Sequence, residues 1–212
     1  YGTSHTYTVT PATGYHVATF LVDGTTATLT AGSYTFTNVT AAATISATFG
    51  THVYNITTSA GANGTISASG SIVCGNNRTI TITPDACYQV ADVLVDGVSV
   101  GAVTSYTFTN VTGDRTISAT FALIPYTITA TASTGGTILP NGATTVNCGD
   151  TLTFSIAAGS GYVLDSVLVN GVNQGAIASY TFNNITANGT IDAYFSSCSN
   201  PATVTIPSTA AI

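Results

Sequence analysis

The sequence has very little charge. Only 5% of its 212 residues are charged, against roughly 25% in an ordinary soluble domain, and it contains no Lys, Glu, Met or Trp. The only bases are Arg78 and Arg115, and the net charge is −6. Surfaces that bind phosphates are built from clustered Lys or Arg, so the composition argues against nucleic acid and anionic membranes as partners.

Other signals are also missing. The sequence has no run of about 18 apolar residues, so we expect no transmembrane helix. It shows neither a signal peptide nor an initiator Met, so we expect a chain that begins after a processing step or a segment of a longer protein. Four Cys residues in a nearly uncharged, Thr-rich chain indicate an oxidising, extracellular location.

Thr takes the place of the charged residues. There are 43 of them, and β-branched residues together with Tyr and Phe favour a pleated sheet. The alternating segments TYTVT, TITIT and LTFSI predict half-buried strands. Asp23-Gly24, Asp96-Gly97 and Asn170-Gly171, each between apolar runs, predict type I′ hairpin turns. No stretch shows helical periodicity, so the predicted fold class is all-β, with short turns and little or no helix.

One repeat accounts for most of the chain, in about two and two-thirds copies. The segment SYTFTNVTAAATISATF, from Ser33, returns as SYTFTNVTGDRTISATF from Ser105 and as SYTFNNITANGTIDAYF from Ser179. The first copy lacks about 20 residues at its front, because Tyr1-Gly2 aligns with Cys74-Gly75. We therefore expect a truncated repeat over 1–50, complete repeats over 51–122 and 123–196, and a tail over 197–212.

These residues resemble a known family. The series YTITATASTGGTI, GYVLDSVLVNGV and SYTFNNITANGTIDAYF is similar to the divergent branch of the internalin-type B repeat (InlB B-repeat-like), found in secreted and surface proteins of bacteria. The resemblance covers nearly all of residues 1–196. It implies a compact β fold related to the β-grasp, and a stalk or adhesion role. The family carries no catalytic motif, so the resemblance implies neither an enzyme nor a cofactor.

The titratable residues indicate no catalytic or metal site. His5, His16 and His52 have no counterparts in the other copies, and we interpret them as surface imidazoles. Asp23 and Asp96 stand before a turn Gly, where the third repeat has Asn170, and this favours a turn role because Asn is a poor substitute for a carboxylate ligand. The alternative is a calcium site, which would be formed by Asp92, Asp96 and Asp114.

The four cysteines predict one or two disulfides. Cys74 and Cys87 occur together only in the second repeat, which favours a bond between them, worth roughly 3 kcal/mol through loop closure. Cys148 then has Cys198 as its only intrachain partner.

Seven Asn-x-Thr sequons are candidate glycosylation sites, since glycans would keep a nearly uncharged surface soluble. The favoured interpretation is that they are turn Asn residues beside strand Thr residues. The sequons begin at Asn38, Asn55, Asn63, Asn77, Asn110, Asn184 and Asn188.

The two ends of the sequence suggest a mode of assembly. A β domain without its opening strand exposes backbone groups along an edge. The tail contains a short apolar-alternating strand between two prolines, formed by Ala202, Thr203, Val204, Thr205 and Ile206. One hypothesis is that this strand is donated to the first repeat of the next copy, which propagates head to tail. The other is that the sequence is cut from a longer array whose tail begins a further domain.

The sequence therefore predicts an extracellular structural protein, either a filament subunit or an adhesin stalk, whose partners are copies of itself. The alternative is a carbohydrate- or surface-binding module of a larger secreted protein, with Tyr34, Tyr106 and Tyr180 presented to glycans. Tyr at the start of a strand more often belongs to the core, and this favours the structural interpretation.

Overall fold

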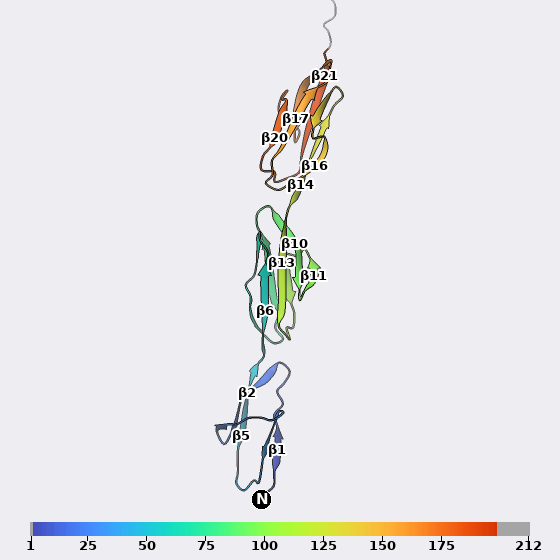
Figure 1. Ribbon diagram of the computed structural model, residues 1–212. Helices are drawn as coiled ribbons and strands as arrows, with labels where there is room; N and C mark the ends of the chain where they lie inside the picture. Colours follow the sequence, from blue (N-terminus) through green and yellow to red (C-terminus); the bar gives the residue numbers. More distant parts are fainter. Residues whose placement is uncertain (1, 199–212) are drawn as a thin grey trace, which may run out of the picture. The chain divides into compact units, whose positions relative to one another are not determined.

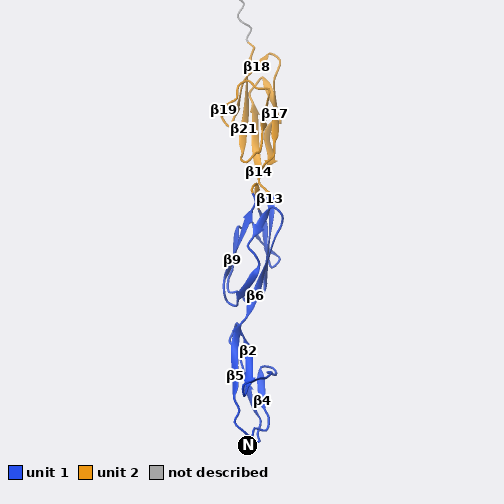
Figure 2. Cartoon of the chain, turned by 90° about the vertical axis from the view of Figure 1, so that its left-hand side faces the viewer, with its two compact units in different colours: residues 1–85, 90–122 blue, residues 86–89, 123–212 orange. Residues whose placement is uncertain are grey.

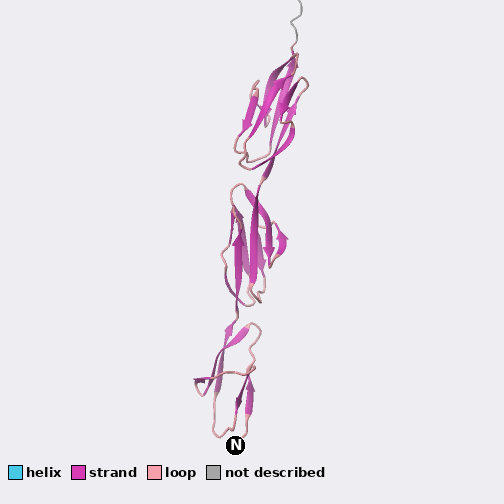
Figure 3. Ribbon diagram, in the orientation of Figure 1, coloured by secondary structure: helices cyan, strands magenta, loops and turns pink. Residues whose placement is uncertain are grey.

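The computed structural model describes residues 2–198, and every regular element among them is a β-strand (Figure 3). The prediction of an all-β fold of small tandem domains is confirmed. The chain forms two compact units, one of residues 1–85 and 90–122 and the other of residues 86–89 and 123–212 (Figure 2). Among the described residues there is no helix long and apolar enough to cross a membrane.

The third repeat lies in the second unit and forms two sheets (Figure 1). Its strands are β14 (Pro125–Ala132), β15 (Gly136–Leu139), β16 (Gly142–Asn147), β17 (Leu152–Ala158), β18 (Tyr162–Val169), β19 (Val172–Asn173), β20 (Ser179–Phe182) and β21 (Gly189–Ser197). One sheet has the order β16-β14-β21-β18-β19, and the other has the order β15-β17-β20. Only β14 and β21 pair in parallel.

The parallel pair is the centre of the larger sheet. It places the first and the last long strand of the repeat side by side, as expected of a β-grasp-like sheet. Ile128 lies opposite Gly189, and Ala130 lies opposite Ile191. Ile128 and Ile191 are at most 1% exposed, because both strands lie inside the sheet and face the core. The core also includes Ile138 of β15 and Phe154 of β17, so both sheets contribute to it.

The second repeat has the same arrangement. Its strands are β6 (Val53–Ala60), β7 (Gly64–Ile66), β8 (Gly70–Val73), β9 (Arg78–Pro84), β10 (Tyr88–Val95), β11 (Val98–Gly101), β12 (Ser105–Phe108) and β13 (Arg115–Leu123). They form the sheets β8-β6-β13-β10-β11 and β7-β9-β12. The parallel pair is now β6 with β13, and Ile56 lies opposite Arg115. Ile56, Ile80 and Ile117 are central to this core.

The first repeat has fewer strands. They are β1 (His5–Thr8), β2 (Tyr15–Val22), β3 (Thr25–Thr26), β4 (Ser33–Phe36) and β5 (Ile45–Thr51). They form one sheet of order β3-β2-β5 and a pair β1-β4. Within residues 2–52 no strand corresponds to β6, β7 or β8. As a result β1 ends at Thr8, whereas its counterpart β9 runs to Pro84 against β7.

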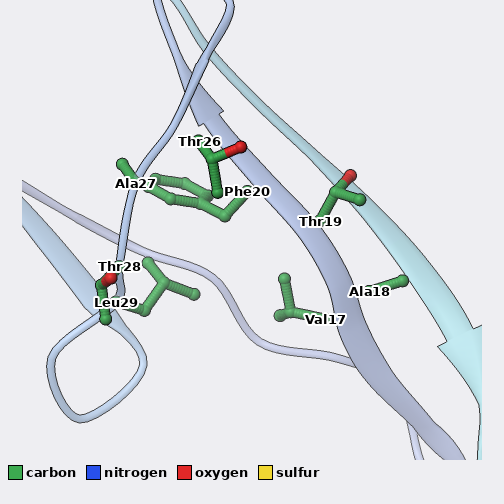
Figure 4. Close-up of a pocket in the computed structure, with 8 residues that line it drawn as sticks. All are labelled: Val17, Ala18, Thr19, Phe20, Thr26, Ala27, Thr28 and Leu29. Atoms are coloured by element: carbon green, nitrogen blue, oxygen red, sulfur yellow. The ribbon is translucent and has the colours of Figure 1, made fainter.

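The first repeat buries little. Phe20 is the only apolar side chain among residues 2–50 that is buried, at 4% exposed, whereas each of the other two repeats has an extended core. Figure 4 shows Phe20 pointing from β2 toward Ala27 in the loop that follows β3, with Leu29 further along the same loop. This small apolar cluster holds the loop against β2.

The predicted hairpin turns are confirmed. Asp23, Asp96 and Asn170 have φ of 47°, 49° and 49°, and each is followed by a Gly with positive φ, as a type I′ turn requires. In each repeat the side chain also accepts a backbone N–H from a residue just before or near the start of the last strand, β5, β13 or β21. The donors are Thr44, Thr116 and Thr190, at 2.7–2.9 Å. Asn serves as well as Asp because the turn needs only one acceptor oxygen.

Candidate functional site

The structure corrects the predicted disulfides. It joins Cys87 to Cys148, with 5.2 Å between their Cα atoms, and leaves Cys74 and Cys198 as free thiols. The pairs Cys74–Cys87 and Cys148–Cys198 are therefore wrong. Cys74 and Cys87 flank opposite ends of the seven-residue strand β9, which at about 3.3 Å per residue separates them by roughly 20 Å. A disulfide needs Cα atoms no more than about 7 Å apart.

The same reason applies to the second predicted pair. Cys148 precedes β17, whereas Cys198 follows β21 and donates its backbone N–H to Gly161 O, beyond the far end of β17. The bond that forms instead lies within the second unit, because residues 86–89 belong to that unit although they follow β9 in sequence. In sequence it joins a residue of the second repeat to one of the third.

The backbone of Ile124 connects the two bonded cysteines. Its N–H donates to Cys87 O at 3.0 Å, and its C=O accepts from the Cys148 N–H at 2.9 Å. We refer to Cys87, Ile124 and Cys148 as the cysteine junction. The disulfide adds a covalent link to a contact that backbone hydrogen bonds already form.

The first unit contains the same arrangement without the bond. The His52 N–H donates to Gly14 O at 2.8 Å, and His52 O accepts from the Cys74 N–H at 2.9 Å. We refer to Gly14, His52 and Cys74 as the glycine junction. Gly14 is the counterpart of Cys87, and a Cβ added there would lie 3.1 Å from Cys74 Sγ and 3.5 Å from Cys74 Cβ. A separation of about 3.5–4.5 Å between Cβ atoms is typical of disulfides.

Cys87 has a backbone conformation that favours glycine. Its φ is 68°, and the equivalent residues Gly14 and Gly161 have φ of 84° and 79°. A side chain in this left-handed region costs about 1 kcal/mol or more relative to Gly. The second repeat therefore holds a Cys at an unfavourable position, and what the Cys adds there is the bond to Cys148.

The second candidate feature is the open edge of the first repeat, which we define as residues 43–47, leading into and forming the start of β5. In the complete repeats the equivalent residues of β13 and β21 pair in parallel with β6 and β14. In the described part of the first repeat, β5 pairs only with β2, on its other side. Its outer backbone groups are free to pair with another strand.

Apolar side chains beside this edge are exposed. Tyr7 is 48% exposed, whereas its counterparts Ile80 and Phe154 are fully buried. Ile45 is half-buried, whereas Ile117 and Ile191 are at most 1% exposed. The open edge is therefore bordered by side chains that form the core of the complete repeats.

Phe49 is exposed for an identifiable reason. In each complete repeat the counterpart of Phe49 packs on a glycine that has no room for a side chain. A Cβ added to Gly64 of β7 would lie 2.4 Å from the ring of Phe121. A Cβ added to Gly136 of β15 would lie 2.2 Å from the ring of Phe195. Phe195 is 9% exposed and Phe49 is 48% exposed. Phe49 instead lines an open hollow with Thr10, Ala12 and Tyr15.

The carboxylates have structural partners in separate places. Asp92 Oδ1 accepts from Ser99 Oγ at 2.6 Å, and Asp114 Oδ1 accepts from the Asn55 N–H at 2.7 Å. The backbone hydrogen bond from Thr116 lowers the pKa of Asp96, and the Arg115 guanidinium, 2.7 Å away, adds to this effect. Among the described residues no three His, Cys, Asp or Glu side chains gather as a metal site.

The His, Tyr and Asn candidates lie as the structural interpretation predicts. His5, His16 and His52 are exposed. Tyr106 and Tyr180 pack against the two cores, and Tyr34 lies edge-on to Phe36 with ring centroids 5.0 Å apart. The three repeat-equivalent sequon residues adopt left-handed turn conformations with φ of 48–51°, which confirms their turn role: Asn38, Asn110 and Asn184. All seven sequon Asn residues are exposed, and their glycosylation stays a prediction.

The predicted donated strand, residues 202–206, lies outside the described residues.

Comparison with known proteins decides the family. The model of the divergent InlB B-repeat domain matches residues 1–52, 54–125 and 126–210. The chain belongs to this family. The divergent InlB B-repeat assignment confirms the resemblance seen in the sequence. Its first two matches follow the first two repeats, and the third runs from residue 126 to residue 210, beyond the predicted end of the third repeat at 196. No curated protein matches the chain.

The first prediction concerns the free-energy cost of the left-handed backbone conformation of Cys87. Cys148→Ser removes the disulfide and should lower the free energy of unfolding by about 4 kcal/mol, the loop-closure value for the observed separation of 61 residues. Cys87→Gly removes the same bond but relieves the backbone at position 87, so its loss should be about 1 kcal/mol smaller. Guanidinium denaturation of both variants measures the difference, and equal or reversed losses would contradict this account.

The second prediction concerns the glycine junction. Gly14→Cys should form a disulfide with Cys74, because the Cβ positions already have the right separation. Thiol titration should find Cys198 as the only free cysteine, and a non-reducing peptide map should show the linked peptides. The double variant Gly14→Cys, Cys74→Ser is the control and should keep its thiols free. A free thiol at position 14 beside a free Cys74 would show that the two junctions differ in geometry.

Proposed function

We propose that the chain is an extracellular structural protein, a subunit of a surface filament or an adhesin stalk, which assembles head to tail with copies of itself. The observation that carries this proposal is the open edge of the first repeat, with exposed apolar side chains at positions that are buried in the complete repeats. Donation of a strand from one copy to the open edge of the next would be a heterologous contact, and such a contact propagates.

The cysteine junction supports a mechanical role. A pull on the ends of the chain passes through the Cys87–Cys148 bond, so the residues between the two cysteines cannot be extended. The disulfide closes residues 87–148 into a ring that includes β13 and β14. β13 belongs to the parallel pair with β6, and β14 belongs to the parallel pair with β21. A covalent bypass of this kind suits a protein that bears tension, and it requires an oxidising compartment.

The surface of the chain supports an extracellular position and a non-catalytic role. It has few charges, and the three carboxylates considered as calcium ligands are each held by separate hydrogen bonds. Glycans on the exposed sequons would add solubility to this surface. Tyr106 and Tyr180 pack against the cores. Their rings are therefore not free to stack on a sugar, which disfavours the carbohydrate-binding alternative.

The third prediction tests the assembly. The 212-residue chain should form oligomers whose size grows with concentration in sedimentation velocity, and removal of residues 199–212 should leave monomers. Adding the synthetic peptide of residues 199–212 to the full chain should shorten the oligomers, because the peptide occupies the open edge without offering a new one. A peptide of the same composition in scrambled order is the control. Oligomers that are unchanged by the deletion would overturn strand donation.

A further inference from the structure

Two of the three histidines lie side by side in the structure, although they are far apart in the sequence. His16 belongs to β2 and His52 directly follows β5. The centroids of their imidazole rings are 5.1 Å apart, and the ring planes are inclined at 49°. Both side chains are exposed, and both residues belong to the same compact unit. The third histidine, His5, contacts the Thr3 hydroxyl instead, at 3.2 Å.

A glycine makes room for the ring of His16. Gly50 lies opposite His16 in the register of β2 and β5. A Cβ added to Gly50 would lie 3.0 Å from His16 Cε1 and 3.1 Å from His16 Nε2, so this edge of the ring faces the strand that leads to His52. The backbone of Gly50 is not left-handed and does not itself require glycine. The complete repeats have Ala122 and Ser196 here, so the position of the His16 ring explains the glycine.

The second imidazole is held by its neighbours. His52 forms the centre of the glycine junction, where its N–H donates to Gly14 O and its C=O accepts from the Cys74 N–H. Its ring lies nearly parallel to the ring of Tyr54, with 18° between the planes and 6.3 Å between the centroids. Tyr54 is half-buried and packs against the core of the second repeat. The backbone and the tyrosine together fix where the His52 ring lies.

The spacing of the two rings suits a shared metal ion. Imidazole nitrogens bind Zn²⁺ at about 2.0–2.1 Å, so two imidazoles on one ion have ring centroids roughly 4.5–5.5 Å apart. The observed separation of 5.1 Å lies in this range. The first repeat, over residues 1–50, contains no Lys or Arg that would repel a cation. Both rings are open to solvent, so water can complete the coordination of the ion.

We propose that His16 and His52 form a binding site for one divalent transition-metal ion of the class that prefers imidazole, such as Zn²⁺, Cu²⁺ or Ni²⁺. The bound ion crosslinks β2 to the segment that leads into β6, at the junction where the structure has no disulfide. It reinforces the glycine junction as the Cys87–Cys148 bond reinforces the cysteine junction. This role does not depend on assembly between copies.

The test is Zn²⁺ binding, measured by titration calorimetry in the variant Cys74→Ser, Cys198→Ser, which has no free thiol to bind zinc. One equivalent should bind. His16→Gln and His52→Ile introduce the residues of the second repeat, and each should weaken binding roughly 100-fold, because the second bond of a chelate is intramolecular. His5→Gln is the matched control and should leave the affinity unchanged. Equal losses in all three variants, or no binding to the parent, would overturn the site.

Two further measurements distinguish this site from scattered binding to surface histidines. Paramagnetic Cu²⁺, added in small amounts to the same thiol-free variant, should broaden the imidazole NMR signals of His16 and His52 before those of His5. Gly50→Ala should weaken Zn²⁺ binding, though less than the loss of either imidazole, because its Cβ would displace the His16 ring. The strand tolerates alanine here, as Ala122 shows. Equal broadening of all three histidines, or an unchanged affinity in Gly50→Ala, would contradict the proposal.

Discussion

The parallel pairing of the first and the last long strand of a repeat is the interaction on which the rest of this structure depends. It brings the two ends of each complete repeat together at the centre of one sheet, and the isoleucines of both strands meet in the core. Where the first strand is present, as in the second and third repeats, an extended set of apolar side chains is buried. Where it is not among the described residues, Phe20 alone is buried. Burial within a repeat thus depends on its opening strands, which include one member of this pair.

The junctions follow from the same construction. Because the last strand of one repeat leads directly into the first strand of the next, one connecting residue, His52 or Ile124, hydrogen-bonds to residues on both sides of it. As a result Gly14 lies beside Cys74, and Cys87 lies beside Cys148. The chain has a disulfide at one such junction and a Gly beside a Cys at the other. The geometry is common to both, and only the residue at the left-handed position differs.

Much of this arrangement could be predicted from the sequence. The alternation of Thr with apolar residues predicted the strands, and the Asp-Gly and Asn-Gly pairs predicted the turns. The disulfide was predicted wrongly. The prediction relied on Cys74 and Cys87 occurring in the same repeat and ignored the strand β9, which separates them. The segment TITIT in that stretch already indicated a strand too long to be bridged.

Two features lay beyond the reach of the sequence. Cys148 as the partner of Cys87 could not be predicted, because the bond joins residues of two different repeats that lie 61 residues apart in the chain. The Asp114 and Asn188 acceptors were also missed, since their donors lie 59 and 61 residues away in the chain. Both depend on pairings between distant segments, which local patterns do not reveal.

The central claim is that the open edge of the first repeat is covered by a strand from another copy. Amide hydrogen exchange tests it most directly, because a paired edge is protected and a free one is not. In the assembled 212-residue chain the amides of residues 43–47 that point away from β2 should exchange at least about tenfold more slowly than in the chain without residues 199–212. The amides of β13 and β21 should be unchanged between the two. Equal exchange at residues 43–47 in both chains would contradict the account.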